Sequence, residues 1–141
     1  MGTHDDYGKK VMRTAFGSAY SDHGPSVLVT FGEGGGRGQI DGTIGPDIAV
    51  EVESRVPKQI RGAVLDLICH PFPNKVLILL PVHMGRTQTA VAQAHFIFRK
   101  FLPPETFRVI LLTGSGNLSA LDADVAALKA GIVGLSRHVA A

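Results

Sequence analysis

Hydrophobic residues recur along this chain at two kinds of spacing, and each kind predicts a different element. Apolar positions three or four residues apart, which are typical of amphipathic helices, occur in 6–20, 57–70, 87–102 and 121–135. Alternating or continuous apolar runs, which are typical of strands, occur in 27–31, 39–44, 48–53, 76–80 and 108–113. The pattern predicts an α/β protein with the order helix, three strands, helix, strand, helix, strand, helix.

The predicted fold is a single α/β domain that spans residues 1–141. Turns rich in glycine or proline at 32–38 and 45–47 join the first three strands, so we expect these strands to form a meander. Strand 76–80 is apolar on both faces, as expected at the centre of a sheet. Ser119, followed three residues later by Asp122, predicts the cap of the last helix.

Three carboxylates fall on the second and third predicted strands. Asp41 lies in 39–44, and Glu51 and Glu53 lie in 48–53. Side chains two residues apart on a strand share a face, so both glutamates should point the same way. Carboxylates held close together repel unless a proton or a cation lies between them, and Mg²⁺ prefers oxygen ligands of this kind. The pattern therefore predicts a metal site.

A second interpretation of the same strand needs no metal. Glu51 and Glu53 alternate with apolar residues, as on the solvent-facing side of an antiparallel strand. Arg55 or Lys58 would then pair with them. The sequence leaves both interpretations open.

Composition narrows the possible partners and location. The 141 residues include 14 Lys and Arg against 12 Asp and Glu, so the formal charge of +2 indicates no strong overall field for nucleic acid. A single cysteine excludes a disulfide framework and a cysteine-based zinc site. Residues 1–10 are polar and the longest apolar run, 76–82, is short, so we expect a cytoplasmic protein that does not enter a membrane.

The order of elements, with Asp41 on the second strand and Glu51-Val52-Glu53 on the third, resembles the PD-(D/E)XK nuclease superfamily of restriction enzymes, junction resolvases and repair nucleases. The resemblance implies a restriction endonuclease-like fold, in which helices flank a mixed β-sheet, and Mg²⁺-dependent hydrolysis of DNA, with Mn²⁺ as a substitute. It also implies that Asp41 and Glu51 bind the metal, with the Val52 carbonyl as a further ligand.

The chain departs from the family motif at two positions. Ile40 precedes the aspartate where proline is usual, and Glu53 stands where the motif has lysine. Some restriction endonucleases of the superfamily also carry glutamate there, and in others the lysine has moved to the following helix, where Lys58 lies here. Glu53 would complete the metal site or orient the attacking water, and Lys58 would neutralise the phosphate.

Basic and polar residues beside the glutamates suggest how DNA would be held. They are Arg55, Lys58, Gln59 and Arg61, together with Arg37 in the glycine-rich turn. The amino end of a helix and the side chains of Arg and Lys favour phosphate, which predicts a polyanionic substrate. The alternative is that these side chains are simply solvated.

The sequence is also compatible with two other functions, and it predicts a possible homodimer. The first is a catalytically weak nuclease-fold module that binds nucleic acid or a protein. The second is a nucleotide-binding α/β domain that uses residues 114–117, which follow a buried strand. A homodimer would supply two sites for two DNA strands, and the last helix, with Gly131 and Gly134, is its predicted surface.

Overall fold

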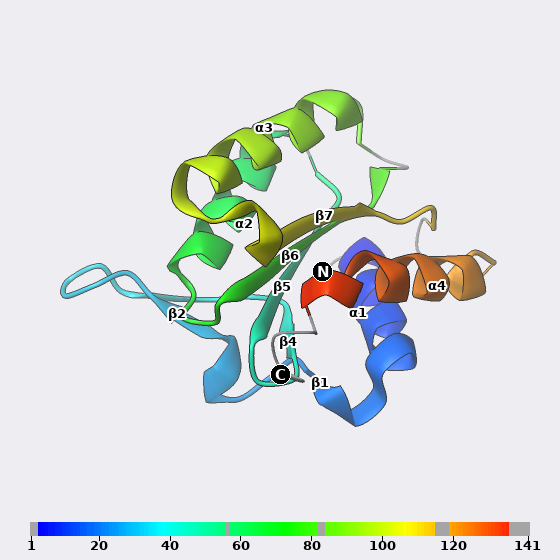
Figure 1. The fold of residues 1–141 in the computed structure, drawn as a ribbon, viewed down its shortest axis with the longest axis horizontal. Helices are drawn as coiled ribbons and strands as arrows, with labels where there is room; N and C mark the ends of the chain where they lie inside the picture. The colour runs from blue at the N-terminus through cyan, green and yellow to red at the C-terminus, as the bar shows by residue number, and fades with distance from the viewer. Residues whose placement is uncertain (1–2, 56, 82–83, 115–118, 136–141) are drawn as a thin grey trace.

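The protein is described by a computed structural model that covers residues 3–55, 57–81, 84–114 and 119–135 (Figure 1). Short 3₁₀ turns occupy 17–19, 25–27 and 104–106. The helices and strands are α1 (Thr3–Phe16), β1 (Tyr20–Ser21), β2 (Leu28–Thr30), β3 (Arg37–Gln39), β4 (Gly42–Ile44), β5 (Ile48–Glu53), α2 (Pro57–Cys69), β6 (Asn74–Leu79), α3 (Thr87–Phe101), β7 (Phe107–Leu111) and α4 (Leu121–Gly131).

A five-stranded mixed sheet forms the centre of the protein, in the order β1-β4-β5-β6-β7. β4 is antiparallel to both of its neighbours, whereas β5, β6 and β7 are mutually parallel. Every residue of β6 is buried, which confirms its predicted place inside the sheet. The predicted α/β class with a mixed sheet is therefore confirmed.

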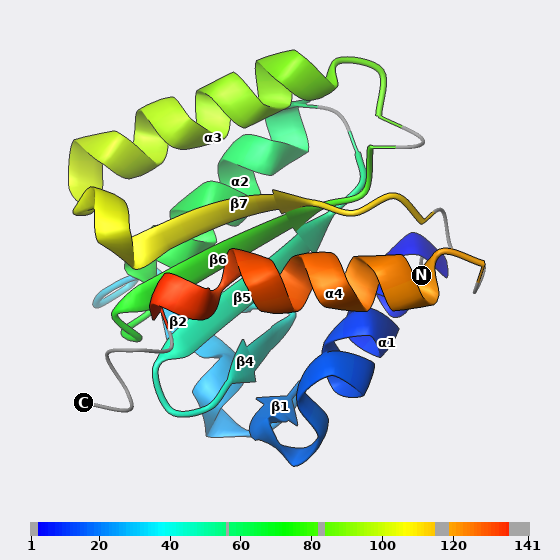
Figure 2. The same ribbon diagram turned by 45° about the vertical axis from the view of Figure 1, so that its right-hand side comes forward.

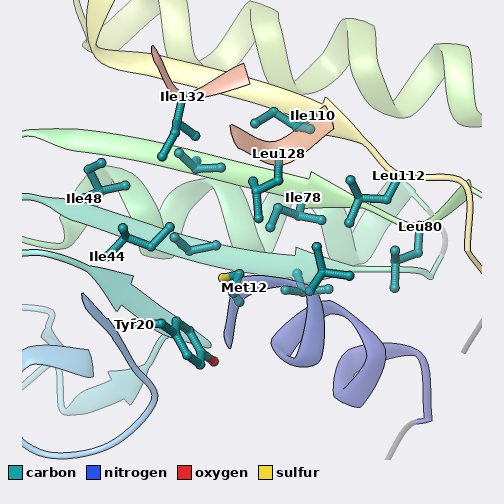
Figure 3. Close-up of a cluster of buried hydrophobic side chains, with 14 of the residues drawn as sticks. Met12, Tyr20, Ile44, Ile48, Ile78, Leu80, Ile110, Leu112, Leu128 and Ile132 are labelled. Atoms are coloured by element: carbon teal, nitrogen blue, oxygen red, sulfur yellow. The ribbon is translucent and has the colours of Figure 1, made fainter. Parts of the chain in front are cut away.

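Helices cover both faces of the sheet (Figures 1 and 2). α1 and α4 pack on one face, called here the α1/α4 face, and α2 and α3 pack on the other, the α2/α3 face. Figure 3 shows the core of the α1/α4 face, in which Met12 of α1 and Leu128 of α4 belong to the same cluster as Ile78 of β6. Within the described part of the chain, no helix is both long enough and apolar enough to cross a bilayer.

The predicted meander is wrong in its first strand. Residues 27–31 contribute β2, which pairs with β3 outside the main sheet, in the register Leu28 to Gln39. The predicted strand 39–44 is divided, because β3 ends at Gln39 and β4 begins at Gly42. The first strand of the sheet is instead β1, which pairs Tyr20 with Ile44. A two-residue strand is too short to produce a recognisable apolar pattern.

The β2-β3 hairpin projects from the body of the protein (Figure 1), and residues 30–37 are all exposed. Its base is nevertheless fixed. The Ile40 N–H donates to the Val27 carbonyl at 2.9 Å. The His70 ring accepts the Phe72 N–H at Nδ1, so Nε2 carries the proton and donates to the Ser26 carbonyl at 2.7 Å. The hairpin is thus anchored to the end of α2.

α4 and the residues that follow it cover the sheet, and Gly131 and Gly134 lie against β7. A Cβ atom on Gly131 would lie 2.6 Å from Ile110 Cδ1, and one on Gly134 would lie 2.5 Å from the Arg108 guanidinium. These glycines allow close packing on β7, which corrects the predicted dimer surface. The predicted cap of the last helix at Ser119 is also wrong, because the N-cap residue is Ala120, which makes no side-chain cap hydrogen bond. The homodimer itself stays a prediction.

Candidate metal-binding acidic site

Asp41 and Glu51 lie side by side at the junction of β4 and β5. The antiparallel register pairs Gly42 with Val50, so Asp41, one residue before β4, lies opposite Glu51. The Asp41 N–H donates to Glu51 Oε1 at 3.0 Å, and the Val52 N–H donates to Asp41 Oδ2 at 2.7 Å. The structure therefore brings together the aspartate and the first glutamate that the sequence analysis singled out.

Both glutamates of β5 point toward the α2/α3 face. Val50 and Val52 belong to the core of the α1/α4 face, whereas Ala49 belongs to the opposite core, and alternation places Glu51 and Glu53 with Ala49. Only 8% of Glu51 and 3% of Glu53 are exposed. The alternative in which these side chains form a solvent-facing strand surface is therefore wrong, because helices cover this face.

A third carboxylate, Asp66 of α2, lies close to this pair. Burial raises its pKa, while a hydrogen bond with Glu51 lowers it and the charge of Asp41 raises it. The sequence analysis did not single out Asp66. Asp66 lies three residues after Ala63 and four before His70, and this spacing places it on the inner side of the helix once the burial of those two residues is known.

The surroundings of Glu51 disfavour the charged form of its side chain. Burial raises the pKa of Glu51 to about 10, and the nearby carboxylates of Asp41 and Asp66 add to the shift. At neutral pH Glu51 therefore keeps a proton in the metal-free protein. A divalent cation can replace such a proton, and carboxylate oxygens are suitable ligands for Mg²⁺.

The side chains alone do not form a complete cage. Among the residues that the structure describes, no group of three or more His, Cys, Asp and Glu side chains is arranged so that it could hold a metal ion. The donors that fit a hard cation are the carboxylates of Asp41 and Glu51, with the main chain at Val52 beside them.

We expect Glu51→Gln to stabilise the metal-free protein, and more so as the pH rises. Between the usual glutamate pKa of 4.5 and the folded value of about 10, the folded state holds a proton that the unfolded state has lost. The free energy of unfolding of the wild type therefore falls as the pH rises through this window. Glutamine does not titrate, so the variant should gain roughly 1–3 kcal/mol at pH 8.

Urea unfolding in EDTA at pH 5 and pH 8 measures this difference. Glu33→Gln is a matched control, because Glu33 is exposed at the tip of the hairpin, and its stability should follow that of the wild type. A Glu51→Gln variant whose difference from the wild type does not grow with pH would contradict a trapped proton.

Glu53 lies on the same strand face but has a different set of partners. Its carboxylate accepts four hydrogen bonds, two from the N–H groups of Ser54 and Arg55 and two from the Arg55 guanidinium. The shortest, from Arg55 Nε to Glu53 Oε2, is 2.7 Å. Glu53 is thus paired with Arg55, as the metal-free interpretation of the sequence allowed.

The other predicted DNA contacts are distributed over two parts of the surface. The Lys58 side chain lies outside the described residues. Gln59 and Arg61 are exposed on α2, and Arg61 donates to Gln93 of α3 at 3.1 Å. Arg37 is exposed at the start of β3. The contacts of these residues with DNA stay predictions.

The predicted nucleotide loop at 114–117 falls largely outside the described residues, since only Gly114 is described. The N–H groups of Thr113 and Gly114 both donate to the carboxylate of Asp124, at 2.8 and 2.9 Å. The start of this loop therefore binds an internal carboxylate, and these two donors are not directed at a phosphate.

The acidic site is defined by a small number of contacts. A carboxylate pair joined through the main chain lies beside a helical aspartate, and a second glutamate is held by an arginine. Comparisons of the chain with protein-family models, with curated proteins and with solved structures gave no match.

Proposed function

We propose that this protein is a metal-dependent nuclease that hydrolyses DNA phosphodiester bonds at the site formed by Asp41 and Glu51. The observation that carries the proposal is the Asp41–Glu51 pair, in which Asp41 is half-buried, Glu51 is buried and burial raises the pKa of Glu51 to about 10. The sheet adds support. Its second strand, β4, is antiparallel to both of its neighbours. Asp41 lies directly before β4, and Glu51 lies on the adjacent strand β5. Such a mixed sheet flanked by helices is what the resemblance to PD-(D/E)XK nucleases implies.

The proposed ligands are Asp41, Glu51 and the Val52 carbonyl. A bound Mg²⁺ supplies a nucleophilic water and relieves the negative charge that develops on the phosphate. The hydrogen bond from the Val52 N–H orients the Asp41 carboxylate toward Glu51. Asp66 increases the local negative charge, which strengthens the attraction for a cation. Arg55 fixes Glu53 at the end of β5, close to where the substrate phosphate would approach.

Incubation of the protein with labelled single-stranded, duplex and branched DNA tests the proposal. We expect cleavage with Mg²⁺ or Mn²⁺ and none with EDTA. Because the contaminating nucleases of a preparation also need metal, the Asp41→Asn protein, purified in the same way, is the required control. Equal cleavage by both proteins would reject the proposal.

We expect Glu53→Gln to lower the single-turnover rate more than Lys58→Met does. Glutamine cannot balance the charge of Arg55 or accept the same set of hydrogen bonds, so the end of β5 would be rearranged. Loss of one electrostatic stabiliser lowers the rate by about 10²-fold, and we expect a loss of at least this size for Glu53→Gln. The Glu53→Gln variant should also bind metal more weakly. Rates measured at saturating Mg²⁺ compare the two, and near-wild-type values for both would contradict both assignments.

A catalytically weak module that binds nucleic acid is a second candidate function. The observation that favours it is the pairing of Glu53 with Arg55 at the position where the family motif has lysine. Such a module would bind DNA, and Asp41→Asn would leave that binding unchanged. Metal-dependent turnover that requires Asp41 distinguishes the nuclease from this module.

A further inference from the structure

The outer surface of α2 and α3 is cationic. In the sequence from 54 to 104, Asp66 is the only acidic residue, and it interacts with Glu51 beneath α2. The basic residues of the same stretch are Arg55, Lys58, Arg61, Lys75, Arg86, Arg99 and Lys100. Lys75 is buried, whereas Arg61, Arg99 and Lys100 are exposed. The outer surface of the two helices therefore attracts an anionic partner, because Asp66 is the only carboxylate on either helix that could repel it.

A groove of about 510 Å³ lies between the two helices on this face. It is lined by Arg61, Ala92, Gln93, Phe96 and Ile97. Phe96 is 61% exposed, and the Lys100 ammonium lies 4.8 Å from the centre of its ring. At the opposite edge, Arg61 donates to Gln93. The groove thus combines an exposed aromatic ring, which has the Lys100 ammonium over it, with the Arg61 guanidinium from the other helix.

We propose that this groove, called here the α2/α3 groove, binds single-stranded nucleic acid. An exposed ring offers a stacking surface for any base, and flanking cations follow the phosphates. The bases of a duplex are already stacked on each other, so Phe96 is suited to an unpaired strand. The amide and guanidinium of Gln93 and Arg61 present hydrogen-bonding groups to base edges.

This inference deepens the proposed function and rests on it for the identity of the substrate. α2 connects the two places, because Asp66 faces the acidic site from its inner side while Arg61 lines the groove on its outer side. A single-stranded arm that leaves the cleaved phosphate would reach the groove around this helix. The predicted substrate is therefore DNA with a single-stranded region, such as a flap or a frayed end.

Fluorescence anisotropy with labelled oligothymidylate of about 16 nucleotides, the upper length for one single-strand-binding domain, tests the groove. The measurement uses the 141-residue Asp41→Asn protein in EDTA, so that no cleavage occurs. In this background, Phe96→Ala should weaken binding about tenfold, the scale of one lost base stack. Lys100→Gln should weaken it severalfold and lower the salt dependence by about one ion.

Phe101→Ala and Lys129→Gln are the matched controls. Phe101 is 62% exposed but does not line the groove, and Lys129 is exposed on α4. Both should bind like the parent protein. Since Phe96 and Lys100 are exposed, thermal unfolding should show intact folding of every variant. Equal affinity of the Phe96→Ala and parent proteins, or no binding of the oligonucleotide at low salt, would overturn the groove proposal.

Two further results separate the possible causes of failure. If the groove variants lose binding to vesicles of phosphatidylserine and phosphatidylcholine but keep their affinity for the oligonucleotide, the face is a membrane contact and the proposal is wrong. Oligonucleotide binding that depends on Phe96, without metal-dependent cleavage, supports the groove and rejects the nuclease. Cleavage of duplex DNA with no effect of Phe96→Ala on single-strand binding supports the nuclease and rejects the groove.

Discussion

Asp41→Asn and Glu51→Gln should each lower the rate of Mg²⁺-dependent DNA cleavage by about 10³-fold or more, the upper range for losing one group that stabilises transition-state charge. The two side chains contribute the carboxylate oxygens of the proposed metal site, and an amide is a weaker ligand for a hard cation. Each amide keeps the shape of its carboxylate, so a large loss reports on charge and not on packing. Single-turnover rates at saturating DNA measure the effect.

Asp122→Asn is the matched control for these variants. Asp122 is exposed in the first turn of α4, on the opposite face of the sheet from the acidic site. Its rate should equal that of the wild type. Undiminished cleavage by either Asp41→Asn or Glu51→Gln would remove that residue from the site, and recovery at high Mn²⁺ would indicate weakened metal binding.

The pairing of Asp41 with Glu51 could be predicted from the sequence because it depends on a short turn and on alternation along one strand. Gly45, with a φ of 62°, lies in the tight turn between β4 and β5, and this conformation is one that glycine adopts without strain. A turn of fixed length determines the antiparallel register. Alternation along β5 then determines the face of Glu51 and Glu53. These steps need no information from distant parts of the chain.

The contribution of Asp66 depends on tertiary structure. Its proximity to Glu51 requires α2 to pack back across β5, and an apolar stripe of about 100° or more sets the rotation of a helix only approximately. The pairing of Glu53 with Arg55 likewise depends on the local path of the chain after β5, where the main chain at Ser54 and Arg55 turns its N–H groups toward the carboxylate. Strand alternation alone does not distinguish Glu51 from Glu53.

The inserted β2-β3 hairpin explains the error in the predicted meander. Residues 27–31 have an apolar pattern as strong as that of a sheet strand, yet their partner is β3 and not β4. Val27 and Ile40, at the base of the hairpin, are apolar because their side chains are buried in the core of the α2/α3 face. Apolar periodicity identifies a strand but not its partner.

Asp124→Ala should lower the free energy of unfolding by about 3–5 kcal/mol, the scale for removing one partner from a buried polar network. Asp124 is 1% exposed. Its carboxylate accepts hydrogen bonds from the Tyr7 hydroxyl at 2.6 Å, from both the N–H and the hydroxyl of Thr113, and from the Gly114 N–H. The variant leaves these donors without an acceptor and removes the contact that links α1, α4 and the residues that follow β7.

Urea unfolding at pH 7 measures this loss, with Asp122→Asn as an exposed control on the same helix. Tyr7→Phe removes one hydrogen bond and should cost about 1–2 kcal/mol. Burial alone would raise the pKa of Asp124, but the hydrogen bonds from Thr113, Tyr7 and Gly114 outweigh it and hold the pKa below the usual 3.8. The stabilisation is therefore complete above pH 3.8 and is lost as the pH falls through the folded value. A wild type and an Asp124→Ala variant with equal stability at pH 7 would contradict the role of this network.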